Sequence, residues 1–365
     1  MVYLSWIVGA AVSSVTVRQS LVIPLPNGRD LGGTPLRNGR VVAHNRLLRS
    51  ASPADASAAV VDELIHTHGL RTVIDLRSQR ECDKDEGTCL LHTAHGAPSL
   101  KLLPMLDEQM LRDGLKRKLL RKPLLLLTLL PLMLLRLLPS RRLREYRRRA
   151  RDRVLGRLLE TTSLDEIYTL ILRQRGAELK RLVETLSQPG ALPALVHCTH
   201  GKVRHHCSML AARRTLALAL ALALALALAL ALALTLALGL ALTLALGLGL
   251  TLGLSRGQDR TGVAVAMCLH ICGASLERIA ADYAASHAWG SSVQGRAAME
   301  RLLPEHLKGL VNIEPLCAAH THTMYALFSL VEQRHGSVDR YLDSIGVDAE
   351  LRARCARALT EDAEA

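Results

Sequence analysis

The stretch "ALPALVHCTHGK" (191–202) has the pattern of a buried strand that ends at a cysteine and passes into a tight turn. The short apolar run predicts the strand over 191–198, and Gly201 allows a sharp backbone path after it. The N–H groups of such a turn, and of a helix that begins directly after it, converge on one point and bind an anion. An arginine would complete this site, but "VRHHC" (203–207) follows instead, and then a long run of Leu and Ala.

The missing arginine lies beyond an insertion. When residues 203–258 are left out, Lys202 directly precedes Asp259 and the sequence becomes "ALVHCTHGKDRTGVAVAMCL". Five residues then separate Cys198 from Arg260, whereas 61 residues separate them in the chain. We therefore predict a strand, a short turn and a helix that together form one anion site.

The re-joined loop carries the residue types that an attack on phosphorus needs. We expect the loop amides and the helix dipole to lower the pKa of Cys198, so that its thiolate is available. Arg260 would hold two phosphate oxygens with its planar fork, and Thr261 would donate a hydrogen bond to the departing sulfur. An acid must protonate the leaving oxygen. Asp75, in the strand predicted within "LRTVIDLRSQRE" (70–81), is one candidate, although a residue at this place is more often a hydrogen-bond acceptor at a strand end.

Several further motifs accompany this loop in the chain. They are "NGRDLGG" (27–33), "LLRSASP" (47–53), "VIDLRSQRE" (73–81), "ADYAASH" (281–287) and "GSVDRYLDSIG" (336–346). Together with the re-joined loop they resemble the cysteine-dependent tyrosine/serine protein phosphatase family, over most of residues 24–346. The resemblance implies hydrolysis of phosphotyrosine, or alternatively of phosphoserine, phosphothreonine or phosphoinositides, through a phosphocysteine and without a metal or other cofactor. It also implies Asp259 as the general acid; the alternative role of Asp259 is that of a hydrogen-bond acceptor that stabilises the loop. The phosphate-binding residues that it implies are Thr199, His200, Gly201, Lys202, Thr261 and Gly262.

The surrounding pattern predicts an α/β domain. A helix over 55–69 that ends at Gly69 lies between two strand-like segments, which is typical of an α/β unit. The resemblance implies a protein tyrosine phosphatase-like fold, with a central, mostly parallel sheet flanked by helices on both faces. We expect one such domain over 21–365, preceded by an extension over 1–20. That extension has no Lys or Arg ahead of its apolar residues, unlike an ordinary signal peptide.

The insertion at 203–258 has a composition and length that suit neither a globular core nor a single membrane span. Its low-complexity part, 216–254, has no charged residue and alternates Leu with small residues. As one helix, these 39 residues would extend about 58 Å, against a bilayer core of about 30 Å. Val codons begin with GT and a Gln codon can end in AG, so the segment fits an intron that was not removed. With the insertion in place we expect an inactive site. The alternative is a genuine membrane segment in a catalytically dead, phosphate-binding relative.

Charge and composition limit the partners. The net charge is +13, and residues 101–160, a predicted helical excursion, contain 17 Lys or Arg against six acidic residues. This segment fits a solvated helix face or an anionic membrane surface. Eight cysteines without a disulfide spacing indicate a reduced, cytoplasmic setting, with a membrane location through 216–254 as the alternative. Aromatic residues make up only 2%, which argues against nucleic-acid binding by base stacking. Arg77 and Arg80 fit either contacts to an acidic substrate or exposed surface.

Overall fold

The computed structural model describes residues 23–83, 89–106, 110, 113, 164–199, 257–302, 313 and 317–363. The predicted extension over 1–20, most of the basic segment over 101–160 and nearly all of the insertion over 203–258 lie outside the described residues. The predictions made for these three segments therefore remain predictions.

A five-stranded sheet forms the centre of the described chain. Its strands run in the order β1-β3-β6-β4-β5, and only β1 is antiparallel to its neighbour. Their bounds are β1 Arg29–Asp30, β3 Leu47–Ser50, β6 Ala194–His197, β4 Thr72–Asp75 and β5 Ser99–Leu102. The predicted central, mostly parallel sheet is confirmed. The predicted strand before Cys198 is β6, which lies in the middle of the sheet, where parallel strands are buried on both faces.

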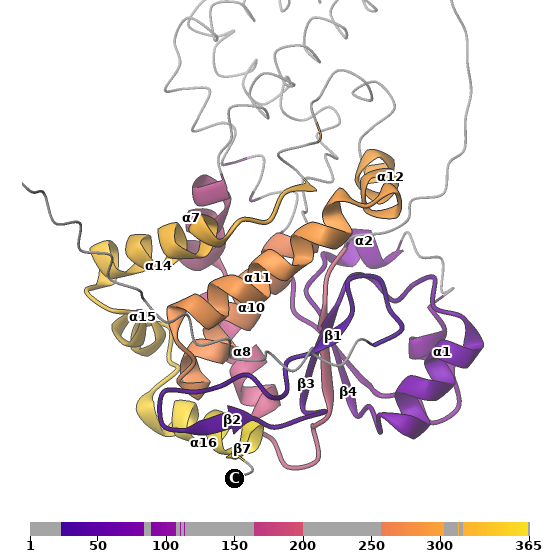
Figure 1. Ribbon diagram of the computed structural model, residues 1–365, viewed down its shortest axis with the longest axis horizontal. Helices are drawn as coiled ribbons and strands as arrows, with labels where there is room; N and C mark the ends of the chain where they lie inside the picture. The colour runs from indigo at the N-terminus through magenta and orange to yellow at the C-terminus, as the bar shows by residue number, and fades with distance from the viewer. Residues whose placement is uncertain are drawn as a thin grey trace, which may run out of the picture.

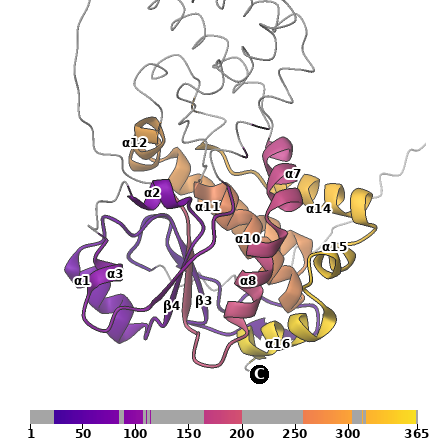
Figure 2. The ribbon, with the colours of Figure 1, turned by 180° about the vertical axis from the view of Figure 1, so that it is seen from behind.

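Helices cover both faces of this sheet. Figure 1 shows α1 on one side of β3 and β4, and α10 and α11 on the other; α8 and α16 lie on that second side in the view from behind (Figure 2). The smaller helix layer consists of α1 (Ala58–Asp62), a π-helical turn (Glu63–Thr67) and α3 (Leu90–Thr93). The larger layer consists of α7 (Leu164–Gln174), α8 (Gly176–Leu186), α10 (Gly257–Cys272), α11 (Leu276–Ser291), α12 (Val293–Leu302), α14 (Thr321–His335), α15 (Val338–Ser344) and α16 (Ala349–Leu359). The short helix α2 (Gln79–Asp83) follows β4, and β2 (Arg40–Val42) pairs with β7 (Thr360–Asp362) in a separate ribbon.

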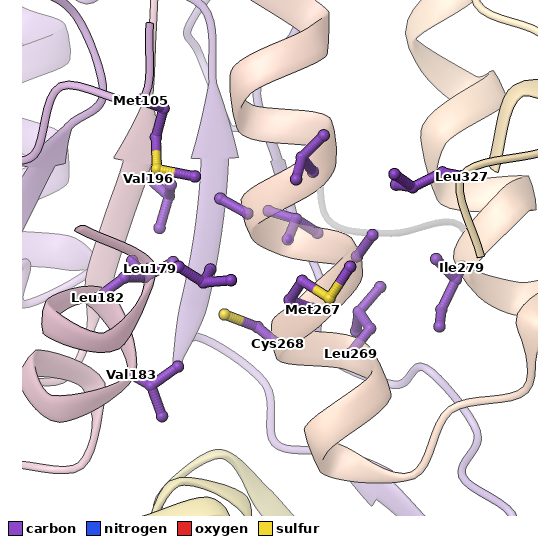
Figure 3. Packing of buried hydrophobic residues seen from close by; sticks show 14 of the residues in the cluster. Met105, Leu179, Leu182, Val183, Val196, Met267, Cys268, Leu269, Ile279 and Leu327 are labelled. Carbon is purple, nitrogen blue, oxygen red and sulfur yellow. The ribbon is translucent and has the colours of Figure 1, made fainter. Parts of the chain in front are cut away.

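Alternation along the strands divides the core into two layers. Val196 of β6 belongs to the cluster beneath α10, whereas its neighbour Leu195 belongs to the cluster beneath α1. This is the expected result of side chains that point to opposite faces at successive residues. Figure 3 shows Val196 and Leu179 on one side of α10, with Ile279 and Leu327 on the other, so α10 is packed between the sheet and the outer helices.

Local sequence signals agree with the helix boundaries. Ser57 accepts a hydrogen bond from the backbone N–H of Val60 and begins α1, and Ser275 begins α11 in the same way. These are N-caps, which satisfy backbone donors that have no partner inside the helix. Gly69, predicted to end the first helix, has a φ of +62°, which glycine adopts without steric cost.

No helix among the described residues is long and apolar enough to cross a membrane. The apolar run over 216–254 lies outside that part of the chain.

Candidate active site

The end of β6 and the first turn of α10 meet at one point. The Sγ of Cys198 lies 2.6 Å from the Oγ1 of Thr261, and both residues are buried. Beside them, Nη2 of Arg260 donates to Oγ1 of Thr199 over 3.0 Å. The structure thus brings together four of the predicted site residues, although 61 residues of chain separate Cys198 from Arg260.

Arg260 is completely buried and held by a carboxylate. Its Nη1 and Nη2 each donate to one oxygen of Glu81 over 2.8 Å, and Nη1 also lies 3.3 Å from the carbonyl oxygen of Leu76. Thr199 donates its hydroxyl to the same carboxylate over 2.6 Å. A two-pronged pair of this kind fixes the plane of the guanidinium. The Nε of Arg260 has no hydrogen-bond partner among the described residues, so one donor on another edge of the group remains available.

Glu81 is a site residue that the sequence analysis missed. It lies in α2, and its Oε2 accepts hydrogen bonds from the backbone N–H and the hydroxyl of Ser78, both over 2.9 Å. Burial alone would raise the pKa of Glu81, but the charge and hydrogen bonds of Arg260 outweigh burial and hold the pKa far below its usual range. A signal was present: Ser78 and Glu81 have the spacing of a capping box, in which the two residues cap each other's backbone N–H groups. That pattern predicts a helix start, but it does not reveal the contact with Arg260.

The electrostatics of Cys198 differ from the expectation. Burial raises the pKa of the thiol, whereas Arg260, the Thr261 hydroxyl and Arg49 act in the opposite direction. The predicted lowering relied on the loop amides and on the helix dipole, and residues 200–202 of that loop lie outside the described part of the chain.

Asp75, a candidate acid, is held as a carboxylate. Arg77 donates to it from Nε at 2.9 and 3.0 Å, from Nη2 at 2.7 Å and from the backbone N–H at 2.9 Å. Burial favours the protonated acid, but His197 and the bonds from Arg77 together hold the pKa of Asp75 well below its usual range. This geometry matches the alternative role of a strand-end acceptor. Arg77 is only 1% exposed, so the alternative of a solvated surface position is wrong for this residue; a contact with an acidic substrate stays a prediction.

Comparison with known proteins identifies the family. The model of the tyrosine phosphatase family matches residues 22–205 and 254–361, which is more than half of the chain. The chain belongs to the tyrosine phosphatase family. It is also 44% identical over 77 residues to a Cupriavidus necator protein named "putative tyrosine-protein phosphatase"; this match covers 21% of the present chain and 28% of the relative.

The family match also bears on the insertion. It leaves residues 206–253 of this tyrosine phosphatase family member unmatched, and these lie within the predicted insertion at 203–258. The matched segments end close to Lys202 on one side and Asp259 on the other. The ends of the predicted insertion, 203–205 and 254–258, fall within the matched segments, so its bounds remain a prediction.

The remaining predicted site residues are Gly262, which the structure describes, and four others whose side chains it does not describe. His200, Gly201 and Lys202 lie outside the described residues, and the side chain of Asp259 is also not described. Gly262 lies in α10, where a Cβ atom would come within 2.8 Å of the Tyr283 ring. Its visible role is therefore to let α10 and α11 pack closely.

Proposed function

We propose that this chain hydrolyses phosphate monoesters through a phosphocysteine on Cys198. The observation that supports this most is the meeting of the Cys198 sulfur with Arg260 and Thr261 in one buried site, across 61 residues of sequence. Membership of the tyrosine phosphatase family makes phosphotyrosine the first substrate class to test. Phosphoserine, phosphothreonine and phosphoinositides are the alternatives.

The reaction has two displacements at phosphorus. In the first, the Cys198 thiolate forms an S–P bond while the bond from phosphorus to the leaving oxygen breaks, and an acid protonates that oxygen. Arg260, held in place by Glu81, binds equatorial oxygens and stabilises their charge. In the second, water attacks the phosphocysteine, the S–P bond breaks and inorganic phosphate leaves. The hydroxyl of Thr261 lies within 2.6 Å of the sulfur and would donate a hydrogen bond to the departing thiolate.

We assign the general acid to Asp259 and not to Asp75. A donor must hold a proton near the working pH, and the pKa of Asp75 is held far too low for this by His197 and Arg77 against the effect of burial. Asp259 directly precedes Arg260 at the start of α10, and no carboxylate on β4 is then needed for catalysis. In an active protein, Asp259→Asn should lower kcat about 100-fold on an ester with a poor leaving group, and much less on an aryl phosphate. Equal losses on both esters would contradict the assignment.

The insertion decides which form of the protein to assay. We propose that 203–258 is an unremoved intron, and that the active protein joins Lys202 to Asp259. Sequencing of the transcript across this junction tests the first part, and a message that always contains the insertion would contradict it. The full chain, which includes 203–258, should be inactive, because the residues of the turn, 200–202, must adjoin the start of α10 to form the phosphate site.

The activity is tested with the chain that lacks 203–258. We expect it to hydrolyse an aryl phosphate, to be inhibited by vanadate and to lose turnover with Cys198→Ser. The matched control is Cys355→Ser, a buried cysteine on α16 that lies outside the proposed site. A shortened protein that folds, as shown by a cooperative thermal transition, but turns over no phosphate ester would refute the proposed function.

Partners and location follow from the same assay. Phosphotyrosine peptide, phosphoserine peptide and phosphoinositide vesicles, compared at equal phosphate concentration, identify the substrate class. The basic run over 141–157 is the sequence reason to include anionic vesicles, although it lies outside the described residues. A cytoplasmic location is the proposal that matches the cysteine pattern, and cell fractionation distinguishes it from the membrane-embedded, catalytically dead alternative.

A further inference from the structure

A second buried arginine lies on the same sheet face as the proposed nucleophile. Arg49 is in β3, directly beside β6, and it pairs in register with Val196. Residues two apart along a strand share a face, so Cys198 lies on the Val196 side. The core agrees, because Val196 and Cys198 belong to the cluster beneath α10, while Leu48 and Leu195 belong to the opposite cluster. Arg49 therefore projects from the neighbouring strand into the layer that contains Cys198.

Arg49 is part of a cluster with an excess of positive charge. Asp282 of α11 accepts from Nε of Arg29 over 2.8 Å and also pairs with Nη1 of Arg49. The hydroxyl of Ser286 accepts from Arg29 over 3.1 Å and lies 3.5 Å from Nη2 of Arg49. Two guanidinium groups thus share one carboxylate. Arg49 is 1% exposed, and its Nε has no hydrogen-bond partner among the described residues.

Among the described residues, the other charged side chains near the end of β6 are paired. Arg260 of α10 pairs with Glu81 of α2, and Arg77, which follows β4, pairs with Asp75 at the end of that strand. Burial and the charge of Arg29 lower the pKa of Arg49 only to about 10, so Arg49 stays cationic near neutral pH. Its charge opposes the effect of burial on the thiol of the nucleophile. Inside a protein such a charge is weakly screened.

We propose that Arg49, anchored by Asp282, is a positioning residue that stabilises the Cys198 thiolate from the neighbouring strand. This rests on the proposed function in one respect, namely that the thiolate is the attacking group. Arg49 itself does not reach the substrate. The shared carboxylate keeps the guanidinium on the strand face, and the uncompensated charge favours ionisation of the sulfur.

The test is a direct titration of the thiolate in the full chain. Thiolate absorbance near 240 nm is recorded against pH for each protein and for the same protein with Cys198→Ser, so that their difference isolates one sulfur. Arg49→Met removes the charge and should move the midpoint up by about one pH unit, whereas Arg49→Lys should restore most of the shift. Asp282→Asn removes the neutralising charge and should move the midpoint down. Arg40→Met is the control, because Arg40 pairs with Asp362 at the exposed ribbon and should change nothing.

The opposite signs separate electrostatics from packing. A purely structural role would make Arg49→Met and Asp282→Asn shift the midpoint in the same direction, and that result would overturn the proposal. Unchanged midpoints in both variants would overturn it as well. If Arg49→Met does not fold, the other two variants still test the proposal. The proposal requires a lower midpoint in Asp282→Asn and a near-normal midpoint in Arg49→Lys. The titration needs no turnover, so a failure of the phosphatase assay and a failure of this proposal are distinguishable.

Discussion

Glu81→Gln removes the carboxylate that neutralises Arg260 while keeping the size of the side chain. Arg260 is fully buried, and Glu81 retains 19% of its side-chain exposure. Removal of one partner from a buried ion pair costs about 3–5 kcal/mol, since the other charge is left uncompensated. The glutamine oxygen still accepts one of the two hydrogen bonds from Arg260, and water reaches the exposed part of the side chain. We therefore expect the free energy of unfolding to fall by about 3 kcal/mol, at the lower end of that range.

Urea denaturation of the full chain at neutral pH measures this loss. Glu184→Gln is the matched control, because Glu184 forms an exposed pair with Lys180 on α8 at 3.7 Å, and exposed pairs contribute about 0–1 kcal/mol. A double-mutant cycle with Arg260→Met isolates the pair itself: the double variant should lose less than the two single variants together, by about 1–3 kcal/mol. If Glu81→Gln costs no more than Glu184→Gln, or if the cycle is additive, the contact does not hold Arg260 in solution and the reasoning fails.

Three further predictions concern pH, packing and capping. His197 is buried with a pKa of about 4, against 6.5 in the unfolded chain, so acid is taken up first by the unfolded state. The free energy of unfolding should therefore fall by about 3 kcal/mol as the pH drops from 6.5 to 4. The depressed pKa of Glu81 extends the loss below pH 4.5; a flat profile in urea titrations from pH 7 to 3 would contradict both. Gly262→Ala places a methyl group against the ring of Tyr283 and should destabilise by about 1–3 kcal/mol, seen as a lower Tm. Asp348→Ala removes the N-cap of α16 and should cost about 1 kcal/mol in the same assay, while Asp348→Asn should cost much less.

The fold was predictable where the pattern is local and strong. The apolar run before Cys198 is too short for a helix and is bounded by residues that break regular structure, which predicts a buried strand. The structure has this strand as β6. The helix that ends at Gly69 was similarly marked by spacing and a terminal glycine. The order of strands was not predictable in this way. Nothing local in the residues of β3 indicates that it pairs with β6, which begins more than a hundred residues later.

Site residues were predictable where the residue type and its spacing indicate one chemical role. Cys198 and Arg260 could be paired from the spacing of the re-joined loop, and they lie in one site as expected. Glu81 and Arg49 could not, because acidic and basic residues on a short helix or strand are usually exposed. Arg49 is buried and Glu81 is partly buried, and distant segments supply their partners, Asp282 for Arg49 and Arg260 for Glu81. Long-range charge pairing is the information that a local pattern lacks.

The described chain on the two sides of the insertion meets at Thr199 and Arg260. Nη2 of Arg260 lies 3.0 Å from Oγ1 of Thr199, so the chain that leaves after Thr199 returns to its immediate surroundings. A connection of four residues, namely His200, Gly201, Lys202 and Asp259, spans up to about 17 Å over five steps, since each step advances about 3.3–3.6 Å. The 3.0 Å distance joins two side-chain atoms, so the backbones of Thr199 and Arg260 are further apart by the length of the arginine side chain. The reach of the connection is long enough to cover this larger separation and still form a turn. The reach is thus sufficient for four residues to join Thr199 to Arg260, and the deletion also takes Gly257 and Gln258 from the start of α10. The shortened chain is for this reason the protein whose activity should be measured first.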